Sequence, residues 1–183
     1  MIRICVLCRE EKLNNIKFKN LLNHFIIIIL IFITDRISKI YLLNLYENGT
    51  DVDFYIFPFL NIYLAWNTGI GFGLFSTDPN IFYHFLTILI GIINLVLIIL
   101  LFKLNDIRKY FISMILGGSF GNFFDRIYYF AVPDFMDMHI GNFHWFIFNI
   151  ADIFITIGII CLILVEIFNK NTNINKEDDA KDT

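Results

Sequence analysis

An uninterrupted apolar run from Ile81 to Phe102 constrains this chain more than any other feature, because it contains no charged residue over 22 positions. At about 1.5 Å per residue, a helix of this length crosses a hydrocarbon core of about 30 Å. The whole chain is 57% hydrophobic and 17% charged. Soluble domains typically have about 45–50% apolar and about 25% charged residues. The sequence therefore predicts an α-helical integral membrane protein with a single domain.

The composition also excludes several classes of protein. A net charge of -3 argues against a protein that binds nucleic acid by neutralising phosphates, so no nucleic-acid partner is expected. With 10 Gly and 3 Pro in 183 residues, collagen-like and disordered chains do not fit. Cys5 and Cys8 form a lone C-x-x-C with no second pair, which favours two incidental thiols over a redox or zinc site.

Four apolar segments predict four transmembrane helices. The first is interpreted as a retained span because no small-residue cleavage site follows it. A basic leader (1–20) precedes it and a polar tail (169–183) follows the last span. The predicted spans are 21–43, 81–102, 110–130 and 146–168, with outer loops at 44–80 and 131–145.

The positions of lysine and arginine predict the orientation of these spans. Residues 1–20, the short loop 103–109 and the tail all contain basic residues, whereas 44–80 and 127–147 contain none. Since basic loops stay in the cytoplasm, both termini are expected inside and the two longer loops outside. The aromatic stretch from Val52 to Trp66, interrupted by Pro58, predicts a short hairpin or a small sheet in the first outer loop.

Ionisable residues gather at one level of the predicted spans. Each such residue costs several kcal/mol in the membrane unless it is paired or hydrated. Counting along the helices places all of these ionisable residues in the outer half of the membrane, and coincidence explains such a grouping poorly. They are Asp35, Lys39, Asp125, Arg126 and Asp152, with Asp134 following in the outer loop.

Several of these features have a structural interpretation. Asp35 and Lys39 are one helical turn apart and could simply neutralise each other. Asp125 and Arg126 could orient the chain or pair with charges of another span. A stripe of small residues at Ser113, Gly117 and Gly121 predicts close helix packing rather than a ligand site.

Two possible ligand sites are judged improbable. His139 and His144 lie near Asp134 and Asp137, but their irregular spacing favours interfacial hydrogen bonding over a metal site, so no metal is expected. The segment 67–73 is rich in glycine, yet it lacks a lysine and the strand-to-helix context of a phosphate-binding loop. A tight exposed loop is predicted there.

Asp134 and Asp152 remain without a basic neighbour in the sequence. Two carboxylates in a shielded site tend to share one proton. Such a pair can accept a proton from water and donate another to a carbonyl oxygen, which is peptide hydrolysis by general acid–base catalysis. An ion or proton relay uses the same residues and is not excluded by this chemistry.

Five sequence blocks, in order, resemble those of lipoprotein signal peptidase (signal peptidase II), over residues 20–168. They are Asp35-Arg36-Ile37-Ser38-Lys39, Asn67-Thr68-Gly69-Ile70-Gly71-Phe72, residues 117–126 (GGSFGNFFDR), Val132-Pro133-Asp134-Phe135 and Phe148-Asn149-Ile150-Ala151-Asp152. Three positions depart from the usual family pattern, namely Gly71, Pro133 and Phe146. Pro133 and Phe146 affect the expected loop shape and leave the aspartate pair intact.

The resemblance implies an aspartic endopeptidase of the bacterial inner membrane that cuts prolipoproteins just before a diacylglyceryl-modified cysteine and is sensitive to globomycin. Asp134 and Asp152 match the catalytic pair, and the first outer loop would form a small extracytoplasmic cradle-like sheet. A monomer without a cofactor is expected, in contact with membrane lipid. The positions matching substrate-binding or supporting residues are Asp35, Lys39, Asn67, Gly69, Asn122, Asp125, Arg126, Asn149 and Ala151.

The main alternative is a small proton-coupled transporter that uses the same carboxylates. It predicts an inverted repeat or spans broken by Gly and Pro in matching halves, and the sequence has neither. A membrane scaffold explains the buried carboxylates poorly.

Overall fold

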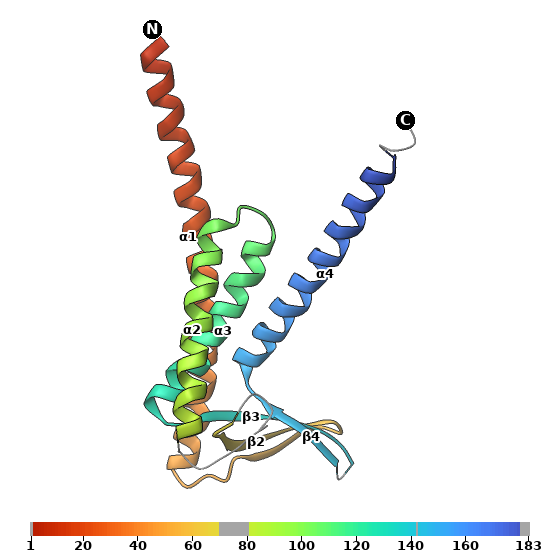
Figure 1. Cartoon of the computed structure of the whole chain (residues 1–183). Coiled ribbons are helices and arrows are strands. Elements are labelled where there is room, and N and C mark those ends of the chain that lie inside the picture. The colour runs from red at the N-terminus through yellow and green to blue at the C-terminus, as the bar shows by residue number, and fades with distance from the viewer. Residues whose placement is uncertain (1, 70–80, 142, 180–183) are drawn as a thin grey trace.

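The computed structural model describes the backbone of residues 2–69, 81–141 and 143–179, and the side chains of 21–69, 83–141 and 143–169. Long helices stand on one side of a small sheet, and the ends of α1 and α4 farthest from the sheet point the same way (Figure 1). The helices in the described residues are α1 (Ile2–Glu47), α2 (Ile81–Lys103), α3 (Arg108–Tyr128) and α4 (Ile150–Asp179).

Helix α3 packs against the other three helices. Small residues allow this close approach, since a Cβ atom added at Gly117 would lie 2.8 Å from the Cβ of Ile31 on α1. A Cβ at Gly118 would collide with the carbonyl oxygen of Ala151 on α4, and one at Gly121 with the carboxylate of Asp35. The close helix packing predicted for the small-residue stripe is confirmed.

The sheet is an antiparallel meander in the order β1-β2-β3-β4. Its strands are β1 (Asp53–Phe57), β2 (Leu60–Asn67), β3 (Val132–Ile140) and β4 (Phe143–Phe148). The hairpin predicted between Val52 and Trp66 is confirmed by β1 and β2. Leu42 of α1, Val52 and Phe135 of β3 form a buried apolar cluster that joins the sheet to the end of α1.

Two boundaries differ from the sequence prediction. The sheet is not confined to the first outer loop, because β3 and β4 come from the segment expected to be the second loop and the first turn of the last span. The apolar run Phe143–Phe148 pairs with β3 as a strand, and short apolar runs fit either a strand or a helix by pattern alone. Helix α1 also continues to Glu47, and Gly49 with φ of 78° reverses the chain after it.

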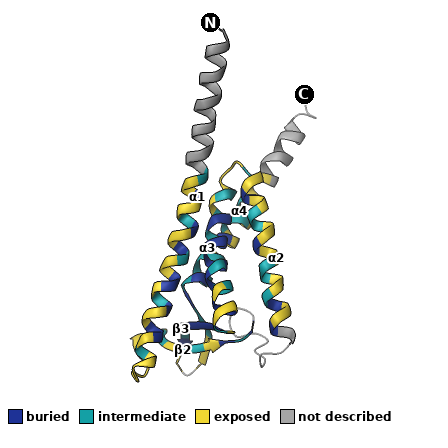
Figure 2. Ribbon diagram, turned by 90° about the vertical axis from the view of Figure 1, so that its left-hand side faces the viewer, coloured by how far each residue is buried: buried dark blue, intermediate teal, exposed yellow. Residues whose placement is uncertain are grey.

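The outer faces of the helices are apolar and exposed, whereas the buried residues lie between the helices and against the sheet (Figure 2). Within the described residues, two segments are long and apolar enough to cross a membrane, Tyr83–Lys103 and Ile150–Asn169. Only 17% and 11% of their most apolar windows are buried inside the protein, as expected for helices that face lipid. Helices α1 and α3 contain buried charged residues near the sheet, which lower their hydropathy.

Candidate active site

Local sequence places Asp152 at the start of α4. The helix begins at Ile150, so Asn149 is its N-cap and Asp152 its third residue. The Asn149 side-chain oxygen accepts a hydrogen bond from the Asp152 backbone N–H at 3.1 Å, and Asp152 Oδ2 accepts one from the Asn149 backbone N–H at 3.1 Å. This reciprocal pair is a capping box, with Asn and Asp in place of the usual Ser or Thr and Glu. It holds the Asp152 carboxylate at the helix end nearest the sheet.

Strand pairing places Asp134 opposite the end of β2. Asp134 of β3 is in register with Ala65, two residues before Asn67. Asn67 Nδ2 donates to Asp134 Oδ2 at 2.8 Å, and Asn149 Nδ2 donates to Asp134 Oδ1 at 2.6 Å. Asp134 is only 2% exposed. Both of its carboxylate oxygens are therefore held by neutral amides from two other elements.

Asn122 on α3 joins the two aspartates. Its Nδ2 donates to Asp152 Oδ1 at 2.8 Å, and its Oδ1 accepts a hydrogen bond from Asn149 Nδ2 at 3.1 Å. Asn149 thereby bridges from Asp134 to Asn122, and Asn122 bridges to Asp152. Among the described side chains, neither aspartate has an ion pair with lysine or arginine. The pair is held by amides alone.

Both carboxylates line one cavity of about 480 Å³ between the sheet end of the helices and the faces of α2 and α4. Its walls combine polar groups near the aspartates with aliphatic side chains farther along α2 and α4. The lining residues are Asn67, Leu86, Leu89, Ile90, Ile93, Ser119, Asn122, Arg126, Val132, Asp134, Asn149, Asp152, Ile155, Thr156 and Ile159.

The environment of Asp134 favours its protonated form. Burial, followed by the negative charge of Asp152, raises the pKa of Asp134 to about 7, against the lowering effect of the Asn67 and Asn149 amides. A carboxyl group that binds a proton near neutral pH can act as an acid in one step and as a base in the next. Asp134 therefore has a pKa suited to proton transfer near neutral pH, and the charge of Asp152 contributes to it.

Behind this cavity lies a second buried group, the charge cluster, formed by Asp35, Arg36, Lys39 and Asp125. Lys39 Nζ contacts Asp35 Oδ2 at 2.9 Å and Asp125 Oδ2 at 2.7 Å. Arg36 contacts the same two carboxylates, at 3.2 Å from Asp35 and 2.5 Å from Asp125. Two cations thus neutralise two anions. The mutual pairing expected for Asp35 and Lys39 is confirmed, and Asp125 is the partner of charges from another helix.

The charge cluster also contacts the site through neutral groups. Asp35 Oδ1 accepts the backbone N–H of Ala151 at 3.1 Å, so α1 caps one of the unpaired N–H groups at the start of α4. Lys39 Nζ donates to Asn122 Oδ1 at 3.0 Å, which leaves the Asn122 amide group pointing to Asp152. The cluster therefore orients the start of α4 and the Asn122 side chain.

Arg126 fixes the chain that follows β2. Its Nη2 donates to the carbonyl oxygen of Gly69 at 2.7 Å, and the Gly69 N–H donates to Asn67 Oδ1 at 2.9 Å. These bonds orient the Asn67 side chain, whose amide group donates to Asp134. Tyr83 on α2 donates to the carbonyl oxygen of Arg126 at 2.8 Å, which ties the end of α3 to α2.

The structure brings every predicted site residue into the cavity wall or the adjoining network. Three contributors were missed, Arg36, Ser119 and Thr156. Arg36 was part of a quoted sequence block, and its position beside Asp35 in a predicted span could have singled it out as a third charge. Ser119 and Thr156 line the cavity, but a single hydroxyl on a helix gives no signal in the sequence.

The histidines of the second loop lie farther along the sheet. His144 on β4 contacts Asp137 on β3 at 2.6 Å, and its ring lies 5.5 Å from that of His139. Among the residues that the structure describes, no three His, Cys, Asp or Glu side chains are arranged to hold a metal ion. The glycine-rich loop predicted at 67–73 falls largely outside the described residues, beyond Gly69.

Comparison with known proteins decides the family. The family model described as Signal peptidase (SPase) II matches residues 27–168. This chain belongs to the signal peptidase II family. Members of this family are peptidases, and the match includes both aspartates, the asparagines around them and the charge cluster.

Named relatives and solved structures agree with this assignment. The chain is 55% identical to the lipoprotein signal peptidase of Pelagibacter ubique, over 88% of this chain and 98% of that protein. It is 39% identical to that of Anaplasma phagocytophilum, over 77% and 88%. Two solved structures described as bacterial membrane enzymes superpose with TM-scores of 0.62 and 0.60, at 28% and 31% identity. They cover 82% and 78% of this chain, and the chain covers 90% and 91% of theirs.

These likenesses make the chain a bacterial membrane protein and a peptidase. They give no support to the alternative of a proton-coupled transporter.

Proposed function

We propose that this chain is an aspartic endopeptidase that removes signal peptides from diacylglyceryl-modified prolipoproteins by cleaving before the lipidated cysteine. The observation that carries the proposal is the pair Asp134 and Asp152, one buried and one half-buried carboxylate that line one cavity and are held by neutral amides. Membership of the signal peptidase II family supports the substrate class.

In the proposed reaction, the pair holds one proton. The ionised carboxylate takes a proton from a water molecule, and the water oxygen attacks the carbonyl carbon of the scissile peptide. The protonated carboxyl group donates its proton to the carbonyl oxygen. Collapse of the tetrahedral intermediate then breaks the C–N bond, and a proton passes from the pair to the leaving nitrogen of the cysteine. Because two interacting carboxyl groups titrate as a unit, the starting proton belongs to the pair.

The surrounding residues are proposed to keep this pair in place. Asn149 and Asn67 hold Asp134, while Asn122 and the capping box hold Asp152. Arg126 and Gly69 support Asn67 from behind. Asp35, Lys39 and Asp125, together with the backbone of Ala151, support Asn122 and the start of α4. All of them act as positioning or substrate-binding groups.

We also propose the membrane arrangement. Four spans at about 21–43, 81–102, 110–130 and 146–168 would place both termini in the cytoplasm and the sheet on the extracytoplasmic side. The absence of lysine and arginine from 44–80 and 127–147 supports this orientation, as do the exposed apolar faces of the helices. The sheet would then form the cradle beside the membrane surface, and the chain would work as a monomer.

The aliphatic walls of the cavity suggest how the substrate reaches the aspartates. Leu89 and Ile93 of α2 and Ile159 of α4 line the part of the cavity that leads away from the sheet. An extended apolar signal segment that enters from the bilayer between these helices would bring its last peptide bonds to the aspartates. The diacylglyceryl chains could then remain in the lipid.

The test is cleavage of a diacylglyceryl-modified prolipoprotein by the purified protein, followed by a gel shift. The parent should cleave it, and Asp134→Asn and Asp152→Asn should each lower the rate by at least about 10³-fold, because each removes a group that transfers a proton. Asp137→Asn is the matched control, since Asp137 is a buried carboxylate on the same strand that pairs with His144 instead. Substantial cleavage by both dyad variants, or equal loss in the control, would overturn the mechanism.

A further inference from the structure

Two further cavities lie at the end of the helices that is opposite the sheet. One, of about 230 Å³, is entirely apolar and is lined by Leu21, Leu22, Phe25, Leu101 and Phe102. The other, of about 650 Å³, is partly polar and lies against the connection between α2 and α3. Its walls are Leu21, His24, Phe102, Asn105, Asp106, Ile107, Lys109 and Tyr110.

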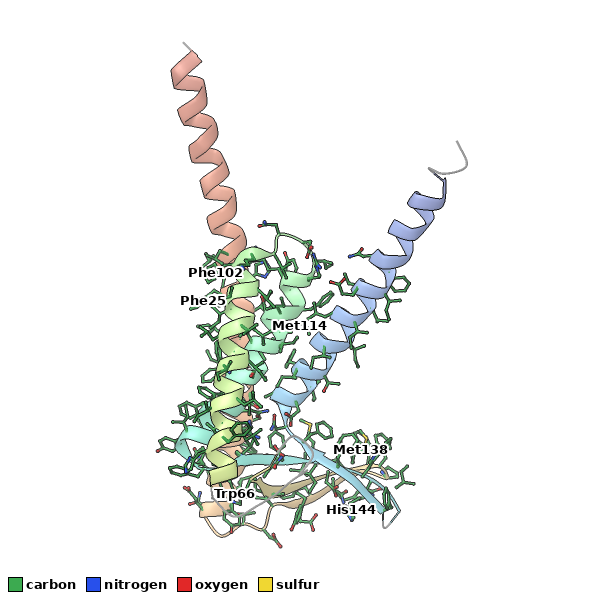
Figure 3. All side chains as sticks on the ribbon, in the orientation of Figure 1. Phe25, Trp66, Phe102, Met114, Met138 and His144 are labelled. Atoms are coloured by element: carbon green, nitrogen blue, oxygen red, sulfur yellow. The ribbon has the colours of Figure 1, made fainter. Side chains whose placement is uncertain are left out.

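The two cavities are neighbours, because Leu21 and Phe102 line both. Figure 3 shows Phe25 and Phe102 at the same level, at the end of the bundle away from the sheet. Together they form one groove, the amphipathic groove, with an apolar part between α1 and α2 and a polar part beside Lys109. A ligand that fills it needs an apolar chain joined to a polar group.

His24 is a buried polar residue that lines this groove. Only 4% of the residue is exposed, and its Nδ1 lies 3.2 Å from Ser113 Oγ. The Ser113 hydroxyl donates its single proton to the carbonyl oxygen of Lys109 at 2.8 Å, so Nδ1 must be the donor to Ser113. In the neutral ring, Nε2 then carries a lone pair. Within the described part of the chain it has no hydrogen-bond partner, so it can accept a hydrogen bond from a ligand hydroxyl.

The polar part contains a lysine without an ion pair among the described residues. Asp106 is already matched, because Arg108 binds its carboxylate at 2.6 Å and also contacts Glu166 at 2.6 Å. Lys109 has no ion pair among the described residues, and it is partly buried in the wall of the groove. The polar part of the groove therefore offers this lysine and one hydrogen-bond acceptor.

We infer that the amphipathic groove binds an anionic phospholipid whose headgroup has hydroxyl groups, with the chemistry of phosphatidylglycerol. Lys109 contacts the phosphate, and His24 Nε2 accepts a hydrogen bond from a headgroup hydroxyl. An acyl chain lies along Phe25 and Phe102. The inference rests on the proposed membrane orientation, which places this end at the cytoplasmic leaflet, where basic residues meet anionic lipid. It does not depend on the peptidase mechanism at the other end.

The test is retention of lipid by the full-length protein, measured by native mass spectrometry after exchange into micelles containing equal amounts of phosphatidylglycerol and phosphatidylcholine. The parent should retain phosphatidylglycerol preferentially. Lys109→Gln should lower that preference roughly fivefold, the effect of one basic residue near a lipid surface. The matched control is Lys103→Gln, an exposed lysine at the end of α2 that does not line the groove and should leave the preference unchanged.

Two results would overturn the inference. One is a parent protein with no preference for phosphatidylglycerol. The other is an equal loss in Lys103→Gln and Lys109→Gln, which would indicate general surface attraction. Phe25→Ser tests the apolar part and should reduce retention of both lipids. Peptidase activity measured on the same samples keeps the two proposals apart, since a protein that retains the lipid without cleaving substrate fails only the proposed function.

Discussion

The charge cluster and the dyad are two neighbouring groups of carboxylates that differ in their partners. In the charge cluster, Asp35 and Asp125 each contact both Lys39 and Arg36. In the dyad, the partners of Asp134 and Asp152 within the described residues are backbone and asparagine groups. In the charge cluster, each anion is matched by a cation. An uncompensated pair keeps a proton, which is the property that acid–base chemistry requires.

The two groups also differ in what they contact. The charge cluster lies between α1 and α3 and caps α4 through Ala151, whereas the dyad lines a cavity that a substrate can enter. Asn122 is the residue that touches both, through Lys39 on one side and Asp152 on the other. We therefore expect the cluster to determine stability, the dyad to determine the reaction, and Asn122 to affect both.

The largest expected effect on stability comes from breaking the cluster. Lys39→Met leaves an uncompensated buried negative charge and should lower the free energy of unfolding by about 3–5 kcal/mol. Asp134→Asn removes no cation partner and should change it by no more than about 1 kcal/mol, the value of one hydrogen bond. Denaturant titration in mixed micelles measures both.

Two controls sharpen this result. Lys103→Met removes an exposed lysine and should have little effect. The double variant Lys39→Met/Asp125→Asn removes one charge of each sign and should recover more than half of the loss. If Lys39→Met and Asp134→Asn are equally destabilised, the distinction between the two groups is wrong.

A smaller effect is expected at Asn122, which contacts both the charge cluster and the dyad. Asn122→Ala removes the amide that donates to Asp152 Oδ1, a hydrogen bond to a charged acceptor worth about 1.5–3 kcal/mol. Cleavage should therefore slow by roughly 10–150-fold while the protein stays folded. The steady-state rate and the midpoint of thermal unfolding should be measured together. A rate close to that of the parent would mean that Asp152 is positioned by its capping box alone.

The smallest effect concerns pH. Because burial and the Asp152 charge raise the pKa of Asp134 to about 7, the pair should lose its remaining proton as the pH rises above that value. The cleavage rate should then fall by about tenfold per pH unit. Because the pKa of Asp134 is raised from 3.8 in the folded protein, its protonated form also contributes to stability. This contribution is complete below pH 3.8 and is lost as the pH rises through 7.

Initial rates between pH 5.5 and 9 in intact membranes would show this profile. A rate that stays constant or increases up to pH 9 would contradict a proton-sharing dyad.

Much of the site could be predicted from the sequence because its chemistry depends on residue type. Charged residues in apolar helices must be paired or functional, and this argument alone singled out Asp35, Lys39, Asp125 and Asp152. The hairpin between Val52 and Trp66 followed from its aromatic composition and its turn. The aspartates could be named before any contact was known, since neither has a basic neighbour along the chain.

Tertiary structure decided how these residues divide into two groups. Arg36 became a partner of Asp125 only because Gly117 and Gly121 bring α1 against α3. The strand Phe143–Phe148 formed because β3 was available to pair with it, and this shifted the start of α4 to Ile150.

The sequence by itself thus determined an apolar chain with carboxylates that had to be buried, since that follows from hydropathy and charge. Which carboxylates received cations, and which received only amides, depended on contacts between residues up to 116 positions apart. A pattern along the chain cannot encode such distances, because hydrogen bonds of about 3 Å arise only when the helices and the sheet pack.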